Sequence, residues 1–247
     1  MDDLTDDQDA FGRLLDDYLH GGYGVELVEW DDGLLGMAGG PSQYFALYDA
    51  WPPHERAAMD WVRGRVLDIG CGAGRHALHL QEQGLDVLGI DVSPRALAVC
   101  RERGLREARV LDIARIDRDL GLWDTMLLLG ANFGLMGSAD GARALLARLA
   151  DVGAVSTRII AESRDPATAS DPAQLAYQAA NVRGGRLPGQ LRLRIRYKRY
   201  ATPWFEYLFV AKAELEQLLR GTEWRVTQYL DAEMAEGGYI ALIEKIG

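Results

Sequence analysis

A glycine-rich turn between an apolar strand and a helix is the part of this sequence best suited to hold a ligand. The largely apolar run Val66–Ile69 leads straight into Gly70-Cys71-Gly72-Ala73-Gly74, and a predicted helix follows over Gly74–Gln83. Glycine is needed where the backbone turns with φ > 0, or where a ligand lies against the main chain. A strand, a tight turn and a helix N-terminus together present unpaired amide donors. The pattern therefore predicts a pocket for a nucleotide-type ligand.

Two aspartates stand at the ends of the next two predicted strands. Asp91 ends the strand Asp86–Ile90, 17 residues after Gly74, and Asp112 follows Val110-Leu111. A single carboxylate can accept hydrogen bonds from both hydroxyl groups of a ribose. A glycine turn without a ligand would explain the glycines, but it would not explain acids at two successive strand ends.

The succession V-L-D-I-G-C-G-x-G, D-V-S-P and L-D-I resembles the class I S-adenosylmethionine-dependent methyltransferases. The resemblance implies S-adenosylmethionine as cofactor and an α/β fold with a Rossmann-like, seven-stranded, mostly parallel sheet that ends in an antiparallel C-terminal hairpin. It implies cofactor contacts for the following residues: Asp68, Gly70, Gly72 and Gly74 around the methionine part, Asp91 on the ribose, and Val92, Asp112 and Ile113 around the adenine. Cys71, Gly130 and Tyr44 are also predicted to bind the cofactor. For Asp112, a loop-capping role is the alternative.

A dinucleotide-binding fold is the main alternative to this assignment. Its fingerprint is G-x-G-x-x-G/A followed by an acid about 20 residues later. Counted from Gly70, the third small position is occupied by Arg75. A bulky cation at that position argues against close packing around a pyrophosphate, so a nicotinamide cofactor is disfavoured.

The residues that would act on the acceptor are less clearly marked. The fourth predicted strand ends in Leu128–Gly134, which lacks the N-P-P-Y sequence of the methyltransferases that act on amino groups of DNA or glutamine. The acceptor atom, whether O, N, S or C, is therefore not identified, nor is the need for a general base. The candidate catalytic residues are His20, His54, Asn132 and Tyr207. Each has an ordinary alternative as a packing histidine, a turn residue or a core aromatic.

Length and composition limit the class of protein. The chain has 247 residues and 48% apolar residues, enough for one large α/β domain. No stretch approaches the ~18 uncharged apolar residues of a membrane span, and the acidic N-terminus is unlike a targeting peptide. Cys71 and Cys100 have neither metal-ligand spacing nor a disulfide pattern. We therefore expect a cytoplasmic protein with no membrane partner and no metal site, while the oligomeric state stays open.

Charge is distributed unevenly along the chain. The net charge is −10, which disfavours nucleic-acid partners, since these require cations to neutralise phosphates. Residues 1–32 contain eleven acids and one arginine, whereas residues 183–199 contain seven basic residues and no acid. The basic run is interpreted as a solvated strand face. The alternatives are a surface for an anionic substrate group or for the acidic N-terminal segment.

Alternating strands and helices from Arg65 to Glu162 are typical of a parallel sheet covered by helices on both faces. We predict one methyltransferase domain over 1–247. It comprises an N-terminal cap or lid (1–60), a cofactor-binding core (61–162), a substrate-side insertion (163–210) and a C-terminal helix with two strands (211–247). The predicted function is methyl transfer from S-adenosylmethionine to a small-molecule acceptor. An NAD(P)-dependent oxidoreductase and a non-catalytic S-adenosylmethionine-binding protein are the alternatives.

Overall fold

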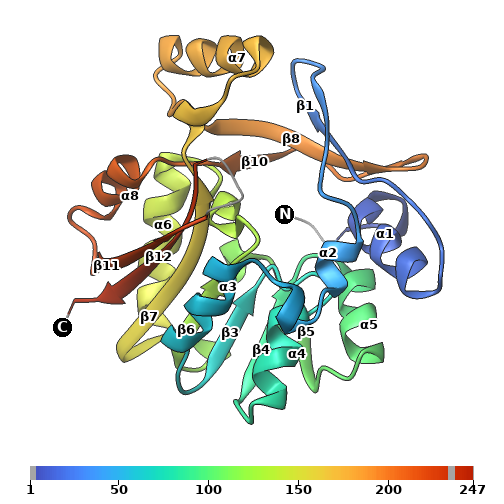
Figure 1. Ribbon diagram of the computed structural model, residues 1–247. Coiled ribbons are helices and arrows are strands. Elements are labelled where there is room, and N and C mark those ends of the chain that lie inside the picture. Colours follow the sequence, from blue (N-terminus) through green and yellow to red (C-terminus); the bar gives the residue numbers. More distant parts are fainter. Residues whose placement is uncertain (1–3, 233–236, 247) are drawn as a thin grey trace. The chain divides into compact units, whose positions relative to one another are not determined.

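The fold is a mixed α/β architecture built on a seven-stranded sheet, seen in a computed structural model that describes residues 4–232 and 237–246 (Figure 1). The strands lie in the order β11-β12-β7-β6-β3-β4-β5. β4 and β5 pair in parallel, as do β6 and β7, whereas β12 is antiparallel to both β7 and β11. The predicted mostly parallel sheet with an antiparallel C-terminal hairpin is therefore confirmed. Among the described residues, no helix combines the length and apolar character required to cross a bilayer.

The chain divides into two compact units, which we describe separately. Unit 1 comprises residues 1–50, 67–115 and 192–205. Its helices and strands, some of which extend a residue or more into unit 2, are α1 (Ala10–Leu19), β1 (Leu27–Trp30), β2 (Leu35–Met37), α2 (Ser42–Phe45), β3 (Val66–Ile69), α4 (Arg75–Glu82), β4 (Val87–Asp91), α5 (Pro94–Glu102), β5 (Glu107–Val110), β8 (Gln190–Tyr197) and β9 (Tyr200–Ala201).

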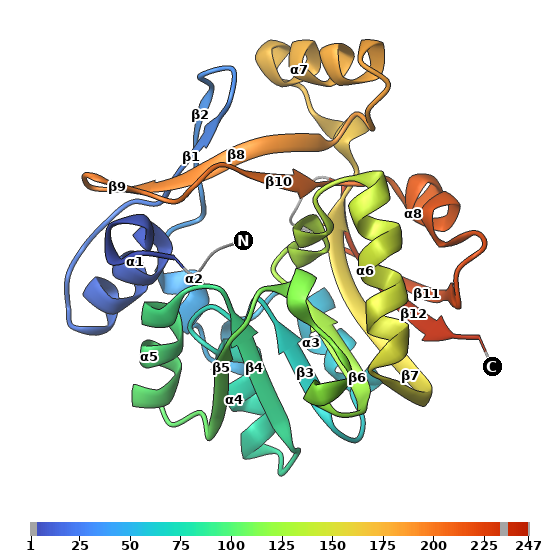
Figure 2. The same cartoon turned by 180° about the vertical axis from the view of Figure 1, so that it is seen from behind.

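Unit 2 comprises residues 51–66, 116–191 and 206–247. Its main elements, again with small overlaps at the boundaries, are α3 (Pro53–Ala58), β6 (Trp123–Leu128), the 3₁₀ helix η6 (Asn132–Met136), α6 (Ala139–Asp151), β7 (Gly153–Arg164), α7 (Pro172–Arg183), β10 (Phe205–Leu208), α8 (Lys212–Leu219), β11 (Trp224–Asp231) and β12 (Gly238–Lys245). Within this unit, α3 and α6 cover opposite faces of the sheet (Figures 1 and 2).

The central strands form because they are predominantly apolar runs that can be buried on both faces. Every residue of β3 and β4 is buried, including Asp68 and Asp91. The helices that follow them begin with recognisable signals: Ser93 caps α5 by accepting a hydrogen bond from the amide of Ala96, and Pro94 occupies the first turn. The sequence placed these strands and helices to within one to three residues at each end.

The basic run in β8 is paired with acids rather than only solvated. Within unit 1, Glu29 of β1 lies opposite Arg194 of β8. It accepts hydrogen bonds from Arg194 at 2.8 and 3.0 Å and from Arg196 at 2.7 Å. These two guanidinium groups lower the pKa of Glu29 to about 2. Lys198 similarly pairs with Asp17 of α1 at 2.5 Å. The contacts match the alternative in which the basic run holds the acidic N-terminal segment.

Candidate functional site

The glycine turn of unit 1 has the backbone conformation predicted for it. Gly70, Gly72 and Gly74 have φ angles of +70°, +55° and +78°, in the region that side chains disfavour. A Cβ atom on Gly74 would lie 2.9 Å from the sulfur of Cys100, so this glycine also permits tight packing of α5. The turn therefore has a well-defined backbone conformation.

Asp91 ties the glycine turn to the start of α5. Its two carboxylate oxygens accept hydrogen bonds from the amides of Gly72 at 3.0 Å and Ser93 at 2.9 Å. Burial raises the pKa of Asp91 to about 6, and the two amide donors act in the opposite direction. A carboxylate has about four acceptor positions. Two therefore stay available for hydroxyl groups, which fits the ribose contact predicted for this residue.

Asp68 provides a test of whether the residues present suit the expected cofactor. The side chain is buried in β3, and within the described residues nothing hydrogen-bonds to its Oδ2 atom. Burial raises the pKa of Asp68, while nearby His76 and the amide of Ala77 act in the opposite direction. A buried acceptor atom without a partner, directly before the glycine turn, fits the ammonium group of a methionine moiety.

The predicted adenine contacts and Tyr44 also lie in unit 1, whereas Gly130 lies in unit 2. Val92 is 37% exposed, which leaves an apolar surface directly after Asp91. Asp112 accepts a hydrogen bond from the amide of Ala114 at 2.9 Å, so the loop-capping role is present. Ile113 begins a short 3₁₀ helix and is half-buried. Tyr44 donates a hydrogen bond to the buried Glu26 at 2.8 Å.

Helix α1 is fastened beside the glycine turn by a residue that the sequence did not mark as functional. Asp9 is 2% exposed and caps α1 by accepting from the amide of Gly12. The same carboxylate accepts from the Ser93 hydroxyl at 2.7 Å and from the Arg95 amide at 3.0 Å. One side chain thus joins the N-termini of α1 and α5. Figure 2 shows these two helices as neighbours. The sequence feature that could have identified this role is the acidic residue Asp9, shortly before the helical run Phe11–Leu19.

Apolar side chains of α1 also pack on the glycine turn. Leu15 of α1 packs with Ala73 of the turn and with Ala96 and Val99 of α5. The ring of Phe11 lies 3.5 Å from the position that a Cβ atom on Gly72 would take. Residues of the predicted N-terminal cap therefore contact the glycine turn directly.

In unit 2, a carboxylate holds the loop that follows β6. Parallel pairing of Leu128 with Ala161 places Glu162 of β7 beside this loop. Glu162 Oε2 accepts hydrogen bonds from the amides of Gly130 at 2.7 Å and Ala131 at 3.2 Å. Glu162 was not predicted as a site residue, although it ends an apolar strand as Asp91 does.

The same loop is held on its other side by Tyr207 of β10. Its hydroxyl donates to the carbonyl oxygen of Ala131 at 2.8 Å, and its ring lies where a side chain on Gly134 would collide. Ala131 has a φ of +64°, an uncommon conformation for a residue with a side chain. Asn132 follows and begins η6. The loop is therefore held in a constrained conformation by contacts from two other strands.

The predicted catalytic histidines have different surroundings. His54 is buried in α3, and its Nε2 atom lies 3.7 Å from Glu162 Oε1. Unit 2 thus brings His54, Tyr207 and the Gly130–Asn132 loop together around Glu162. His20 is in unit 1, where it is exposed at the end of α1 and lies 3.3 Å from Glu102. A hydrogen bond to the Asp16 carbonyl raises the pKa of His20.

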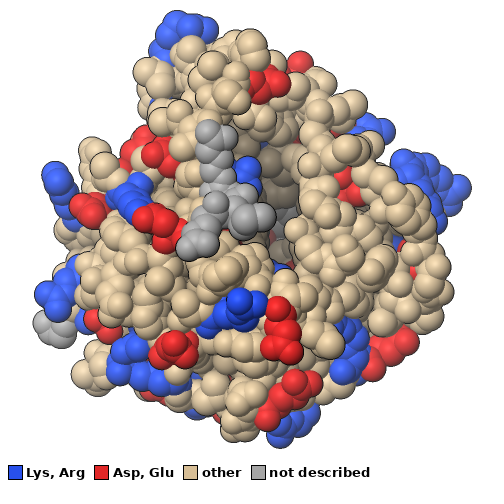
Figure 3. All heavy atoms as spheres, in the orientation of Figure 1, with Lys and Arg blue, Asp and Glu red and all other residues tan. Residues whose placement is uncertain are grey.

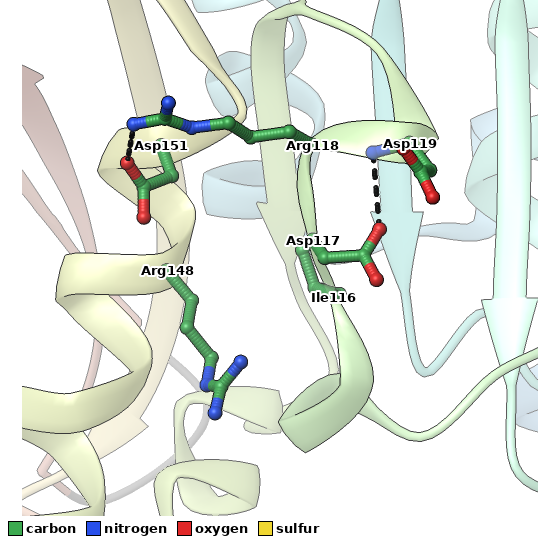
Figure 4. Close-up of a pocket in the computed structure, with 6 residues that line it drawn as sticks. All are labelled: Ile116, Asp117, Arg118, Asp119, Arg148 and Asp151. Atoms are coloured by element: carbon green, nitrogen blue, oxygen red, sulfur yellow. Dashed lines mark hydrogen bonds and ion pairs between the residues drawn. The ribbon is translucent and has the colours of Figure 1, made fainter.

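A surface pocket of unit 2 has no features of a binding site. It lies where the chain enters β6 and where α6 ends, and Figure 4 shows its lining residues, which are Ile116, Asp117, Arg118, Asp119, Arg148 and Asp151. Arg118 and Asp151 already pair at 2.5 Å. Ligands of open α/β sheets bind outside the carboxyl ends of the strands. We therefore place the candidate site at the Gly130 loop and not in this pocket.

The sheet order, the glycine turn and the acids at the strand ends define a class I S-adenosylmethionine-dependent methyltransferase fold. A family model described as "Methyltransferase domain" matches residues 66–154. The resemblance predicted from the sequence is therefore confirmed over that segment.

Two relatives are both named as methyltransferases and differ in what their names say they act on. A glycine/sarcosine N-methyltransferase of Halorhodospira halochloris is 35% identical over 28% of this chain and 28% of its own length. A 23S rRNA (uracil(1939)-C(5))-methyltransferase, RlmD of Thiobacillus denitrificans, is 33% identical over 50% of this chain and 28% of its own length. The chain thus matches less than a third of either relative.

A solved structure resembles the chain over almost its full length. It is a SAM-dependent methyltransferase from Bacteroides fragilis in complex with S-adenosyl-L-homocysteine. The TM-score is 0.83 at 23% identity, covering 99% of this chain and 98% of the other. At this identity the similarity establishes the fold, so the N-terminal and inserted segments also have counterparts in it.

The pKa of Asp91 predicts how cofactor affinity depends on pH. Ribose hydroxyls donate to the ionised carboxylate, so binding favours the charged form. Because the folded-state pKa is about 6, the carboxylate is ionised above pH 6 and becomes protonated below it. We expect the affinity for S-adenosylmethionine to fall about tenfold between pH 7 and pH 5, which follows from one titrating group.

Calorimetric titration of the wild type and of Asp91→Asn from pH 5 to pH 8 checks this expectation. The variant should bind about 1.5–3 kcal/mol more weakly at pH 7, the scale of hydrogen bonds to a charged group. Its affinity should also be flat across the pH range. Equal pH profiles for both proteins would remove Asp91 from the ribose role.

The contacts of Asp9 predict that α1 acts as a cover that a ligand stabilises. We expect limited proteolysis to cut within residues 1–40, and cutting should slow when S-adenosylmethionine or its product is present. Asp9→Ala should raise the cutting rate without ligand, because it removes contacts to both Ser93 and Arg95. If bound ligand leaves the cutting rate unchanged, α1 is a fixed part of the fold.

Proposed function

We propose that this protein transfers the methyl group of S-adenosylmethionine to a small-molecule acceptor. The observation that carries the proposal is the linked turn of unit 1, in which the Gly72 amide donates to Asp91 beside the partnerless Oδ2 atom of Asp68. The fold and the matched domain family support the same activity.

The residues of unit 1 would hold the cofactor through distinct interactions. Asp68 would accept from the ammonium group, Asp91 from the ribose hydroxyls and Asp112 from the adenine amine. When bound, S-adenosylmethionine supplies an electrophilic methyl group for in-line displacement. This chemistry depends mainly on positioning and exclusion of water. The buried side chain of Asp9 joins α1 to α5, and Phe11 packs on the glycine turn. Both contacts favour the exclusion of water from the cofactor.

The acceptor would lie at the carboxyl end of β6, where the Gly130–Asn132 loop is held rigidly. Where its ring nitrogen is not otherwise bound, His54 is the residue there that could remove a proton from a hydroxyl or ammonium acceptor. Tyr207 would maintain the loop and contribute an aromatic surface.

A small acceptor is favoured over a nucleic acid by charge. The net charge is −10. On the face in Figure 3, acidic and basic side chains are interspersed over the described residues, without a continuous basic surface. Three side chains of the most concentrated basic run pair with acids: Arg194 and Arg196 with Glu29, and Lys198 with Asp17. Nucleic-acid binding needs cations that are available to phosphates.

Two measurements test the proposal. Calorimetry with S-adenosylmethionine and with NADH and NADPH should show binding of the first alone. Incubation with methyl-labelled cofactor should then yield labelled product and S-adenosylhomocysteine when amines, phenols and carboxylic acids are offered, but not with RNA. Binding of NADPH alone would support an oxidoreductase. Binding of S-adenosylmethionine with no turnover on any acceptor would support a non-catalytic binding protein.

A further inference from the structure

Three side chains of unit 2 that are far apart in sequence meet at one place in the structure. His54 and Glu55 come from α3, and Glu162 comes from the end of β7. One nitrogen or oxygen atom from each lies within 4.8 Å of the other two. His54 and Glu55 are 7% and 5% exposed, and the side chain of Glu162 is 14% exposed. Buried groups of this kind are rarely gathered without a binding partner.

The distance between His54 and Glu162 suits a bridging ion better than a direct contact. Nε2 and Oε1 are 3.7 Å apart, which is too long for a hydrogen bond. Two ligands that each lie about 2.0–2.2 Å from one metal ion are roughly 3–3.5 Å apart. The His54 side chain is more than nine-tenths buried. A shift of a few tenths of an ångström would place both atoms on one ion.

The surroundings of Glu162 orient it as a metal-binding carboxylate is usually oriented. Its Oε2 atom is fixed by the amides of Gly130 and Ala131, which leaves Oε1 directed toward His54. Outer hydrogen bonds of this kind set the direction of ligating carboxylates. His54 and Glu55 are positioned by Pro52 and Pro53, which fix the backbone at the start of α3.

We propose that His54, Glu55 and Glu162 form a binding site for a divalent transition-metal ion. Two carboxylates held this close repel each other, and a cation bound to both removes the repulsion. One imidazole and two carboxylates form a donor set that Zn²⁺ and Mn²⁺ accept. Mg²⁺, by contrast, prefers oxygen alone. Three protein ligands also leave a coordination position open, as in catalytic zinc sites.

Metal binding by the full-length chain tests this site without any methyl acceptor. After treatment with a chelator, the untagged protein is titrated calorimetrically with Zn²⁺, Mn²⁺ and Mg²⁺. We expect one equivalent of Zn²⁺ or Mn²⁺ per chain and markedly weaker binding of Mg²⁺. His54→Gln and Glu162→Gln should each weaken binding by about tenfold or more. The exposed His20→Gln serves as a matched control and should bind as the wild type does.

Spectroscopy separates loss of a ligand from loss of the fold. The visible absorption of Co²⁺ should appear in the wild type and His20→Gln and disappear in His54→Gln, while circular dichroism stays the same. Absence of stoichiometric binding would overturn the proposal, as would binding that all these variants retain. Either result would leave His54 and Glu162 as a buried pair. It would not affect the cofactor titration that tests the proposed methyl transfer.

Discussion

Replacing Gly72 with valine should abolish binding of S-adenosylmethionine while the chain stays folded. Gly72 has a φ of +55°, which costs a residue with a side chain about 1–2 kcal/mol, and a β-branched residue is the least tolerant. The amide of Gly72 also donates to Asp91 at 3.0 Å, so a shift of the turn would displace the carboxylate as well. Together these effects should weaken binding roughly hundredfold or more, as measured by calorimetry.

Gly84→Val is the matched control for this substitution. Gly84 also has a positive φ, +88°, but it follows α4 at a turn where nothing lies within 4 Å of an added Cβ atom. Both variants should lose a similar amount of thermal stability, whereas only Gly72→Val should lose the cofactor. If the two variants bind equally well, the glycine turn is not the cofactor site.

The grouping of the candidate cofactor residues in unit 1 could be predicted because these residues are local in sequence. The glycines and Asp91 lie within one strand-turn-helix-strand segment, where a parallel sheet brings successive strand ends together. The structure places Asp68, Gly72 and Asp91 in one unit and links two of them by a hydrogen bond. Spacing along the chain was therefore enough to group them.

The grouping of His54, Glu162 and the Gly130–Asn132 loop in unit 2 depends on contacts that no short sequence pattern encodes. Glu162 is 108 positions from His54 and about 30 from the loop that it holds, and the parallel register of β6 and β7 alone brings them together. The rule that identified Asp91, an acid at the end of an apolar strand, applies equally to Glu162. Likewise, the basic run of β8 had several interpretations until its register with β1 placed Glu29 opposite Arg194.

Replacing Glu162 with alanine should release the loop after β6. The amides of Gly130 and Ala131 would lose their acceptor, and hydrogen bonds to a charged group contribute about 1.5–3 kcal/mol. Amide hydrogen exchange in peptides covering residues 129–137 should therefore accelerate by at least about tenfold. Turnover on any acceptor identified should fall roughly hundredfold, because the reacting groups would lose their positioning.

Three further variants show which property of Glu162 matters. Glu162→Gln retains an oxygen that can accept from the two amides, so its exchange rate should lie between those of the wild type and Glu162→Ala. Glu216→Ala removes an exposed carboxylate on α8 and should change neither exchange nor turnover. His54→Gln should leave loop exchange unchanged, since it removes none of the loop's hydrogen bonds. If Glu162→Ala exchanges as slowly as the wild type, Tyr207 and the backbone hold the loop without Glu162. The role of the carboxylate would then be its contact with His54.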